Sequence, residues 1–342
     1  MQLEIVIDGR PLVGQRTGIG VHTAEIARRL DVTPPPLIAT HTAIEDRSGI
    51  EALRFRVDPT PLGVLWQQTK LAAIASDSVL WGPHGTLPLS LRTPSVVTIH
   101  DFTSLTMAHR HRIRTILSFN LVISRSLELA SRVAAVSARV AEETMRGFGV
   151  PASKIELVPN GVDPFFSPAG EEHDYILYTG TIEPRKGIAD LVSVWESLPT
   201  PRPRLVLAGS SGWTTEVPKR DGIEVVGFVG RERLRELYRH ARVFVYPSRH
   251  EGFGIPPLEA MACGAPVIAT RTGAIDEYGA GVIELFNPGD RVALRRSLVQ
   301  LLESPQLRDD LRARGPARAA LYGWDRSASI MTALLSEAGA RG

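Results

Sequence analysis

The chain has 342 residues, of which 43% are hydrophobic and 22% are charged, with a formal net charge of +2 and a single cysteine, Cys263. These values are typical of a folded globular protein long enough for two domains, and the mild charge argues against nucleic acid as a partner. One cysteine permits neither an intrachain disulfide nor a multi-cysteine metal site, which favours a reducing, cytoplasmic compartment.

The amino-terminal segment MQLEIVIDGR predicts a strand and lacks the basic and then apolar order of a signal peptide. No apolar run approaches the roughly 20 residues that cross a bilayer. The basic segment HRHRIR at 109–114 precedes an apolar run at 116–123, a pattern that would allow contact with an anionic membrane surface. We favour the alternative interpretation, a solvated loop ahead of a buried helix.

Short apolar and β-branched runs alternate with helical patterns along the whole chain. Several runs are apolar at successive positions, which is typical of strands buried on both faces of a parallel sheet. This alternation predicts an α/β protein with two doubly wound, Rossmann-like domains. Strands are expected at LEIVID (3–8), LIAT (37–40), VLWGP (79–83), SVVTIHD (95–101), VAAVSA (133–138) and IELVPN (155–160), then at YILYTG (175–180), RLVLAG (204–209), IEVVGF (223–228), VFVYPS (243–248), PVIAT (266–270) and GVIELF (281–286).

Turn-forming residues are densest at 159–164 and 167–170, where we place the linker between domains spanning 1–164 and 165–323. A final helix is expected at 324–342. Its apolar residues Ile330, Leu334 and Leu335 are spaced for one face, and we expect this helix to pack back on the N-terminal domain.

Two places in the first half are candidates for ligand contact. The loop from Gly14 to Gly20, which includes Gly18, follows the first strand, and its amides would face a bound anion, although a plain turn into the next helix is almost as good an interpretation. This loop matches neither G-x-G-x-x-G nor a P-loop. His100 ends an expected strand and would donate to a phosphate or a sugar hydroxyl, or else be a hydrogen-bonded corner histidine. His84 is a weaker strand-end candidate.

In the second half, the segment from Tyr178 to Gly187 leaves a strand and runs toward a helix. Ligands of open α/β sheets gather at this end of a strand. Gly180 permits close backbone approach, and Arg185 and Lys186 together would hold a diphosphate. The alternative is a strand–helix turn with two solvated cations.

Two carboxylates, Glu251 and Glu259, flank a Gly-Phe-Gly loop and a double proline. Proline suits the first helical position, so the loop amides would point at an anion at the helix amino end. Glu259 is then expected in the first helical turn, where its charge would favour the helix dipole. Glu251 has no such explanation, and the pair suggests acceptors for one polyhydroxylated ligand, or the acid and base of a glycosidase.

Together these segments resemble the retaining glycosyltransferases of family four, whose GT-B architecture has two Rossmann-like domains facing a central cleft. The resemblance runs along nearly the whole chain, and EGFGIPPLE reproduces the family's E-x7-E pattern. The segments that carry it are TGIG (17–20), TIHDF (98–102), PNGVD (159–163), TGTIEPRKG (179–187), GFV (227–229) and YPSRHEGFGIPPLEAMACGAPVIAT (246–270).

The resemblance implies a donor site in the C-terminal domain and an acceptor side in the N-terminal domain. Glu259 would bind the ribose hydroxyls of a nucleotide sugar, and Glu251 would contact the donor sugar. Arg185 and Lys186 would neutralise the diphosphate, and His100 would reach the sugar from the other domain, so Glu251, His100, Arg185 and Lys186 are the implied catalytic residues. The other implied donor contacts are Gly18, Gly180, Phe228, Val229, Phe253, Gly254 and Ile255.

The implied reaction moves a sugar from a UDP-, GDP- or dTDP-sugar to an acceptor hydroxyl with retention at the anomeric carbon, without a cofactor or metal. Many relatives have arginine directly after Gly180, where this chain has Thr181, so Arg185 is expected to substitute. The arginine-rich, lysine-poor composition suggests a high-GC bacterium and an acceptor that is an antibiotic, as in enzymes of the avilamycin type, or a surface glycan. The alternatives are a non-catalytic nucleotide-sugar-binding partner and a GT-B epimerase or phosphorylase.

Overall fold

The computed structural model describes residues 4–102, 113–210 and 220–340. The basic segment whose membrane contact was considered above falls mainly outside these ranges. The chain divides into two compact units, Met1–Gly161 with Trp324–Gly342, and Val162–Gly323. The first division therefore falls at Gly161 rather than after Pro164.

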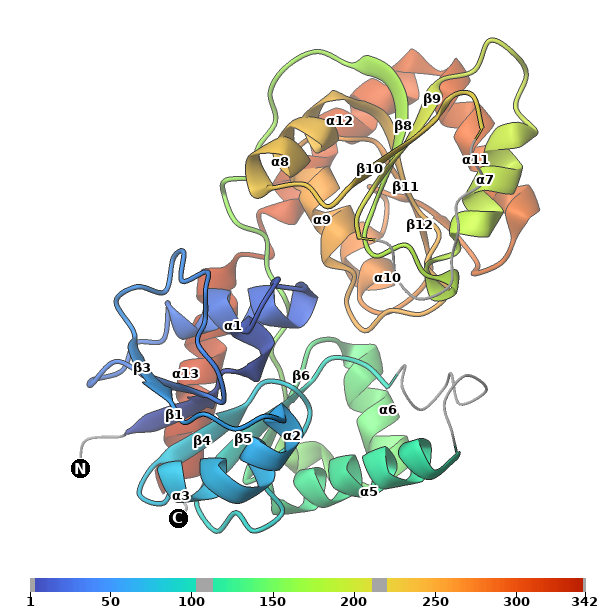
Figure 1. The fold of residues 1–342 in the computed structure, drawn as a ribbon. Coiled ribbons are helices and arrows are strands. Elements are labelled where there is room, and N and C mark those ends of the chain that lie inside the picture. Colours follow the sequence, from blue (N-terminus) through green and yellow to red (C-terminus); the bar gives the residue numbers. More distant parts are fainter. Residues whose placement is uncertain (1–3, 103–112, 211–219, 341–342) are drawn as a thin grey trace. The chain divides into compact units, whose positions relative to one another are not determined.

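The first unit is built on a seven-stranded, all-parallel sheet with the order β3-β2-β1-β4-β5-β6-β7 (Figure 1). Its central strands are apolar and fully buried, as expected for a sheet covered on both faces. The strands are β1 Ile5–Asp8, β2 Leu37–Thr40, β3 Arg54–Val57, β4 Val79–Gly82, β5 Ser95–Ile99, β6 Arg132–Ala135 and β7 Ile155–Leu157. The helices are η1 Arg10–Leu12, α1 Gly18–Ala27, α2 Gly63–Trp66, η2 Gln67–Leu71, α3 Ala72–Ile74, α5 Ile113–Leu129, α6 Ala138–Phe148, η4 Ala152–Lys154 and α13 Trp324–Ala340.

The second unit has a six-stranded parallel sheet with the order β10-β9-β8-β11-β12-β13. Strands β8 and β11 are neighbours at its centre, although β9 and β10 come between them in the sequence. The strands are β8 His173–Thr179, β9 Arg204–Ala208, β10 Ile223–Gly227, β11 Ala241–Tyr246, β12 Val267–Thr270 and β13 Glu284–Phe286. The helices are η5 Pro184–Lys186, α7 Ile188–Glu196, α8 Arg231–His240, α9 Ile255–Ala262, α10 Ile275–Gly279, α11 Arg291–Glu303 and α12 Pro305–Ala319.

Twelve strands were expected, and the structure confirms all of them as members of two parallel sheets. Strand β3, with the sequence RFRV, is the thirteenth and was not expected. It lies at the edge of the first sheet, where Arg54 and Phe55 are half-buried while Arg56 and Val57 are exposed. An edge strand that is partly exposed to solvent does not need the continuous apolar run that identifies the buried strands.

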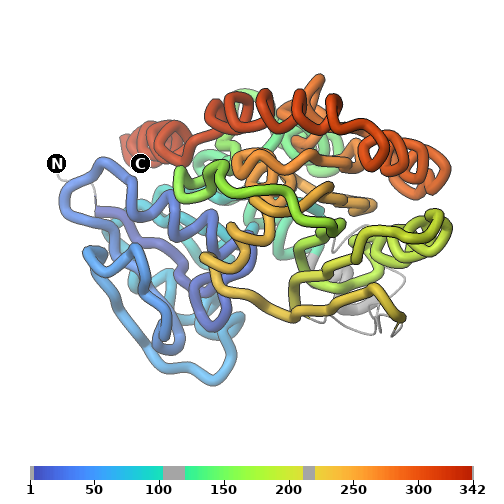
Figure 2. The backbone as a smooth tube through the Cα atoms, turned by 90° about the horizontal axis from the view of Figure 1, so that it is seen from above, coloured from blue at the N-terminus to red at the C-terminus, as the bar shows by residue number. Residues whose placement is uncertain are grey.

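Helix α13 belongs to the first unit, although it follows the whole second unit in the chain. It packs against α1, β4 and β5, and Figure 2 shows its red tube beside the blue N-terminal segment. Trp324, Met331, Leu334 and Leu335 are buried there, so the helix completes the first unit's core. Among the helices of the described ranges, none is long and apolar enough to span a membrane.

Candidate active site

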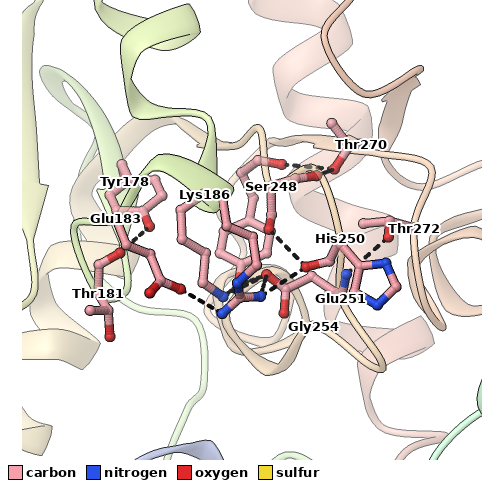
Figure 3. Close-up of polar contacts among 12 residues, drawn as sticks. Tyr178, Thr181, Glu183, Lys186, Ser248, His250, Glu251, Gly254, Thr270 and Thr272 are labelled. Atoms are coloured by element: carbon pink, nitrogen blue, oxygen red, sulfur yellow. Dashed lines mark hydrogen bonds and ion pairs between the residues drawn. The ribbon is translucent and has the colours of Figure 1, made fainter. Parts of the chain in front are cut away.

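The expected site residues of the second unit gather where β8 and β11 end. Because these parallel neighbours point the same way, the segments that follow them meet at one edge of the sheet. After β8 the chain turns through η5, which carries Arg185 and Lys186, and after β11 it runs through Glu251 into α9. Figure 3 shows the two segments joined by polar contacts.

A buried ion pair joins these segments. The Nζ atom of Lys186 lies 2.6 Å from Oε1 of Glu251 and donates to the hydroxyl of Tyr246 at 3.1 Å. The Tyr246 hydroxyl in turn donates to the same Glu251 oxygen at 2.9 Å. The side chains of Lys186 and Glu251 are only 11% and 10% exposed, so each charge depends on the other for compensation.

Glu251 is ionised at neutral pH in this setting. Burial alone would raise the pKa of its carboxyl, but the nearby charges of Lys186 and Arg185 outweigh burial and hold the pKa below its ordinary value of 4.5. Burial and the Glu251 charge raise the pKa of Tyr246 well above its usual range, so the phenol keeps its proton and donates it. The backbone N–H of Glu251 donates to Oγ1 of Thr272, which fixes the loop itself.

Arg185 is held against the same loop. Its guanidinium donates to the carbonyl of His250 at 2.9 Å and to Oε1 of Glu183 at 2.6 Å, and it lies 3.7 Å from the Glu251 carboxylate. The two cations are therefore balanced by two carboxylates, Glu183 and Glu251. Thr181, which directly follows Gly180, is exposed.

The turn into α9 depends on a glycine. Gly254 has φ of +88°, and a Cβ there would lie 2.8 Å from Ile275 side-chain carbons. Its carbonyl accepts a hydrogen bond of 2.6 Å from the buried Tyr278 hydroxyl. Phe253 packs its ring against Tyr278, so the side chain points into the core and only the loop backbone remains for ligand contact. Ile255 then begins the helix.

Glu259 does not lie in the first turn of α9. The helix begins at Ile255, before the double proline, which places Glu259 one turn further along. The expectation of a first-turn carboxylate that favours the helix dipole was therefore wrong. Its Oε2 atom accepts a hydrogen bond of 3.1 Å from the hydroxyl of Tyr238.

The remaining donor-site candidates of the second unit lie at strand ends. Gly180 directly follows β8, with φ of +132° and its N–H bonded to the carbonyl of Ala208. Phe228 follows β10 and is 63% exposed, and Val229 beside it is half-buried. An exposed aromatic side chain at this edge is available to stack on a flat ligand group.

In the first unit, His100 directly follows β5. Its Nε2 lies 2.9 Å from the carbonyl of Pro83, and its ring meets the edge of the buried His22 ring at 4.7 Å. Burial lowers the pKa of His100 to about 4, so the ring is neutral at physiological pH, with Nε2–H donating to Pro83. Nδ1 is then an acceptor rather than the donor that the sequence suggested. Gly18 begins α1, and His84 lies in the turn after β4.

Several residues of the site were not expected from the sequence. Tyr246 is the last residue of an apolar strand, a place that indicates burial rather than contact with Glu251. Glu183 and Thr272 hold Arg185 and the Glu251 loop, and Tyr238 holds Glu259. Their only sequence signal is a position close to the end of a strand or helix at the site. Within the described ranges, no group of three or more histidine, cysteine, aspartate or glutamate side chains is arranged to hold a metal ion.

Comparison with known proteins identifies the family of the chain. The model of the glycosyl transferases group 1 family matches residues 162–318, and that of glycosyltransferase family 4 matches residues 16–165. The O-antigen chain mannosyltransferase B of Escherichia coli is 32% identical over 273 residues, which cover 73% of this chain and 71% of the relative. A D-inositol 3-phosphate glycosyltransferase of Xylanimonas cellulosilytica is 31% identical over 58% of this chain and 55% of its own length.

Solved structures share the fold. Anabaena HepE in complex with UDP-glucose superposes with a TM-score of 0.80 at 18% identity, covering 98% of this chain and 100% of that one. Sucrose-phosphate synthase from Thermosynechococcus elongatus gives a TM-score of 0.78 at 22% identity, with both chains fully covered. The fold is GT-B, and the chain belongs to the family 4 glycosyltransferases. It is a glycosyltransferase.

Proposed function

We propose that this glycosyltransferase takes its sugar from a nucleoside diphosphate sugar bound in the second unit and transfers it to an acceptor hydroxyl with retention and without a metal. The observation that carries the proposal is the buried Lys186–Glu251 pair, with Arg185 beside it, next to the amino end of α9. The E. coli relative is a mannosyltransferase, and the Anabaena protein was crystallised with UDP-glucose. Both support a nucleotide-sugar donor.

The costly event in such a transfer is departure of the nucleoside diphosphate. Arg185, Lys186 and the amino end of α9 supply positive potential where negative charge develops on the leaving oxygen, which stabilises the transition state electrostatically. This is the contribution that a bound metal makes in other transferases. The chain has no Asp-x-Asp segment to hold one.

Retention follows most simply from attack on the face that the diphosphate leaves. In that scheme the departing phosphate oxygen accepts the proton of the acceptor hydroxyl as the new bond forms. A two-step route would need a carboxylate nucleophile. Glu251 is a poor candidate, because its carboxylate is buried and bound by Lys186 and Tyr246. Its proposed role is to orient the sugar and the two cations.

The acceptor is proposed to be a glycan hydroxyl. The relationship to an O-antigen chain mannosyltransferase supports this class over an antibiotic acceptor of the avilamycin type. Incubation with each donor and panels of both acceptor classes, followed by mass spectrometry, separates them. Transfer to an antibiotic scaffold alone would overturn the choice.

The first test is calorimetric titration with UDP, GDP and dTDP in the presence of a chelator, alongside Glu259→Ala. We expect one nucleotide to bind with chelator present and the substitution to weaken it at least about tenfold, since a charged hydrogen bond is lost. Binding of none of the three would overturn the proposed donor class. Trapping a covalent glycosyl-enzyme that turns over competently would overturn the single-step scheme.

A further inference from the structure

A chain of hydroxyl groups from three elements ends on Glu259. Tyr238 of α8 donates to Oε2 of Glu259 on α9 at 3.1 Å, and its oxygen lies 2.8 Å from Oγ1 of Thr179 at the end of β8. Tyr238 is fully buried and Thr179 is nearly so. The Tyr238 ring packs against Phe166 and Phe244, which prevents the phenol from turning away.

The direction of these hydrogen bonds follows from the chemistry of the groups. A carboxylate only accepts, so the single phenol proton of Tyr238 points at Glu259. Burial and the Glu259 charge raise the pKa of Tyr238 well above its ordinary value of 10, so that proton stays in place. Thr179 must then donate to the Tyr238 oxygen. Each bond of the chain polarises the next toward the carboxylate.

We propose that Tyr238 is a positioning residue that fixes the Glu259 carboxylate for recognition of a ribose, so that the site selects ribonucleoside over 2′-deoxyribonucleoside diphosphates. This inference rests on the proposed function, in which Glu259 binds the ribose. A carboxylate accepts from two neighbouring hydroxyls only when its plane faces both. An unanchored glutamate side chain would lose rotational freedom on binding, and Tyr238 removes that loss in advance.

The site should distinguish the two kinds of nucleotide, because a 2′-deoxy nucleotide lacks one of the hydroxyls that the Glu259 carboxylate is positioned to accept from. One carboxylate oxygen then loses its hydrogen-bond partner. The wild-type protein should therefore bind UDP or GDP at least about tenfold more tightly than the matching 2′-deoxy nucleotide. Tyr238→Phe should lower this ratio several-fold by weakening mainly the ribonucleotide. In turnover the donor KM should rise while kcat changes little, because the ribose takes no part in bond breaking.

The probes are UDP with 2′-deoxy-UDP and GDP with 2′-deoxy-GDP, titrated by calorimetry. Tyr175→Phe is the matched control. Tyr175 is a buried tyrosine of the same unit whose hydroxyl donates to the carbonyl of Leu237 at 2.7 Å rather than to a carboxylate. It should lose similar stability and keep the wild-type ratio. Thr179→Val, which keeps the shape of the side chain, should lower the ratio less than Tyr238→Phe and carries the test if that variant does not fold.

Each outcome decides the matter. A wild-type ratio that persists in Tyr238→Phe and Thr179→Val would make Tyr238 purely structural and overturn the inference. Equal binding of ribo and deoxy nucleotides by the wild type would overturn it as well, while leaving a nucleotide site in place. Binding of neither kind, nor of dTDP, would overturn the proposed donor class itself, which distinguishes the two failures.

Discussion

Lys186 and Glu251 show how a single buried pair links stability to the site. Both side chains are about nine-tenths buried, so each charge depends mainly on the other, which lies 2.6 Å away. The low pKa of Glu251 also means that the ionised carboxylate stabilises the fold. That contribution is present above its ordinary pKa of 4.5 and is lost as the pH falls through the lower pKa of the folded protein.

Lys186→Met should therefore destabilise the second unit by about 3 kcal/mol at neutral pH, since it leaves Glu251 buried beside a weaker, more distant cation. The difference from wild type should shrink as the pH falls below about 4.5, because a protonated Glu251 needs no cation. Urea unfolding across this range measures both effects. Lys154→Met removes a lysine that donates to the backbone carbonyls of Leu127 and Glu128 and should cost about 1 kcal/mol, with a smaller dependence on pH. A pH-independent loss in Lys186→Met would contradict this account.

At the scale of elements, the turn into α9 decides where the helix begins. Gly254→Ala should cost about 3 kcal/mol, because a left-handed φ strains alanine and its Cβ overlaps Ile275. Binding of nucleoside diphosphates should weaken with it. Gly289→Ala is the matched control, since Gly289 has φ of +82° with open space around it, and it should cost only about 1 kcal/mol. Equal losses in denaturant unfolding would show that the close packing at Gly254 is unimportant.

Helix α7 is attached to the site by a buried carboxylate in its first turn. Asp190 accepts from Arg291 of α11 at 2.6 Å and from Arg249 at 2.9 Å, and the N–H of Arg249 donates to the carbonyl of Arg185. These arginines outweigh the effect of burial and lower the pKa of Asp190. These contacts connect α7, α11, the loop before Glu251 and the turn that carries Arg185.

Asp190→Asn should destabilise by about 1 to 2 kcal/mol, because two arginines whose side chains are 54% exposed lose a charged hydrogen-bond partner. It should also raise the donor KM, through Arg249 and Arg185. Asp276→Asn breaks an exposed pair with Arg271 and should cost less than about 1 kcal/mol with no kinetic effect. Thermal unfolding measures the loss of stability in the two variants, and steady-state kinetics measures the donor KM. Equal losses of stability and equal KM values in the two variants would contradict the prediction.

Continuous apolar runs made the buried strands predictable. The polar residues and glycines that follow these runs then indicated the edge of the sheet where ligand-binding residues are expected. The edge strand β3 has no such run. Glu259 was placed a turn too early because the prolines suggest a later helix start than Ile255, where the φ of Gly254 sets it. The contact of Lys186 with Glu251 depends on β8 and β11 being neighbours, a fact of sheet order that no local pattern encodes.

At the scale of the whole molecule, α13 makes the first unit depend on the last residues of the chain. Leu335→Ala should destabilise that unit by about 3 kcal/mol, since Leu335 is fully buried. Hydrogen exchange should then rise in α1, β4 and β5 and stay unchanged in the second unit. Leu298→Ala, at a fully buried position of α11, should produce the opposite pattern. Uniform exchange changes in either variant would mean that the units do not unfold separately.

Because α13 belongs to the first unit, the usual order in which the domains of a nascent chain are completed is reversed. Domains tend to fold as units, the N-terminal one first, while the ribosome is still at work. Here all residues of the second unit have left the exit tunnel once Gly323 has emerged. The first unit, whose synthesis began earlier, is still incomplete at that point because it lacks α13, which begins at Trp324. A premature stop codon just after Gly323 would therefore destabilise the first unit, which is synthesised first, and leave the second unit intact.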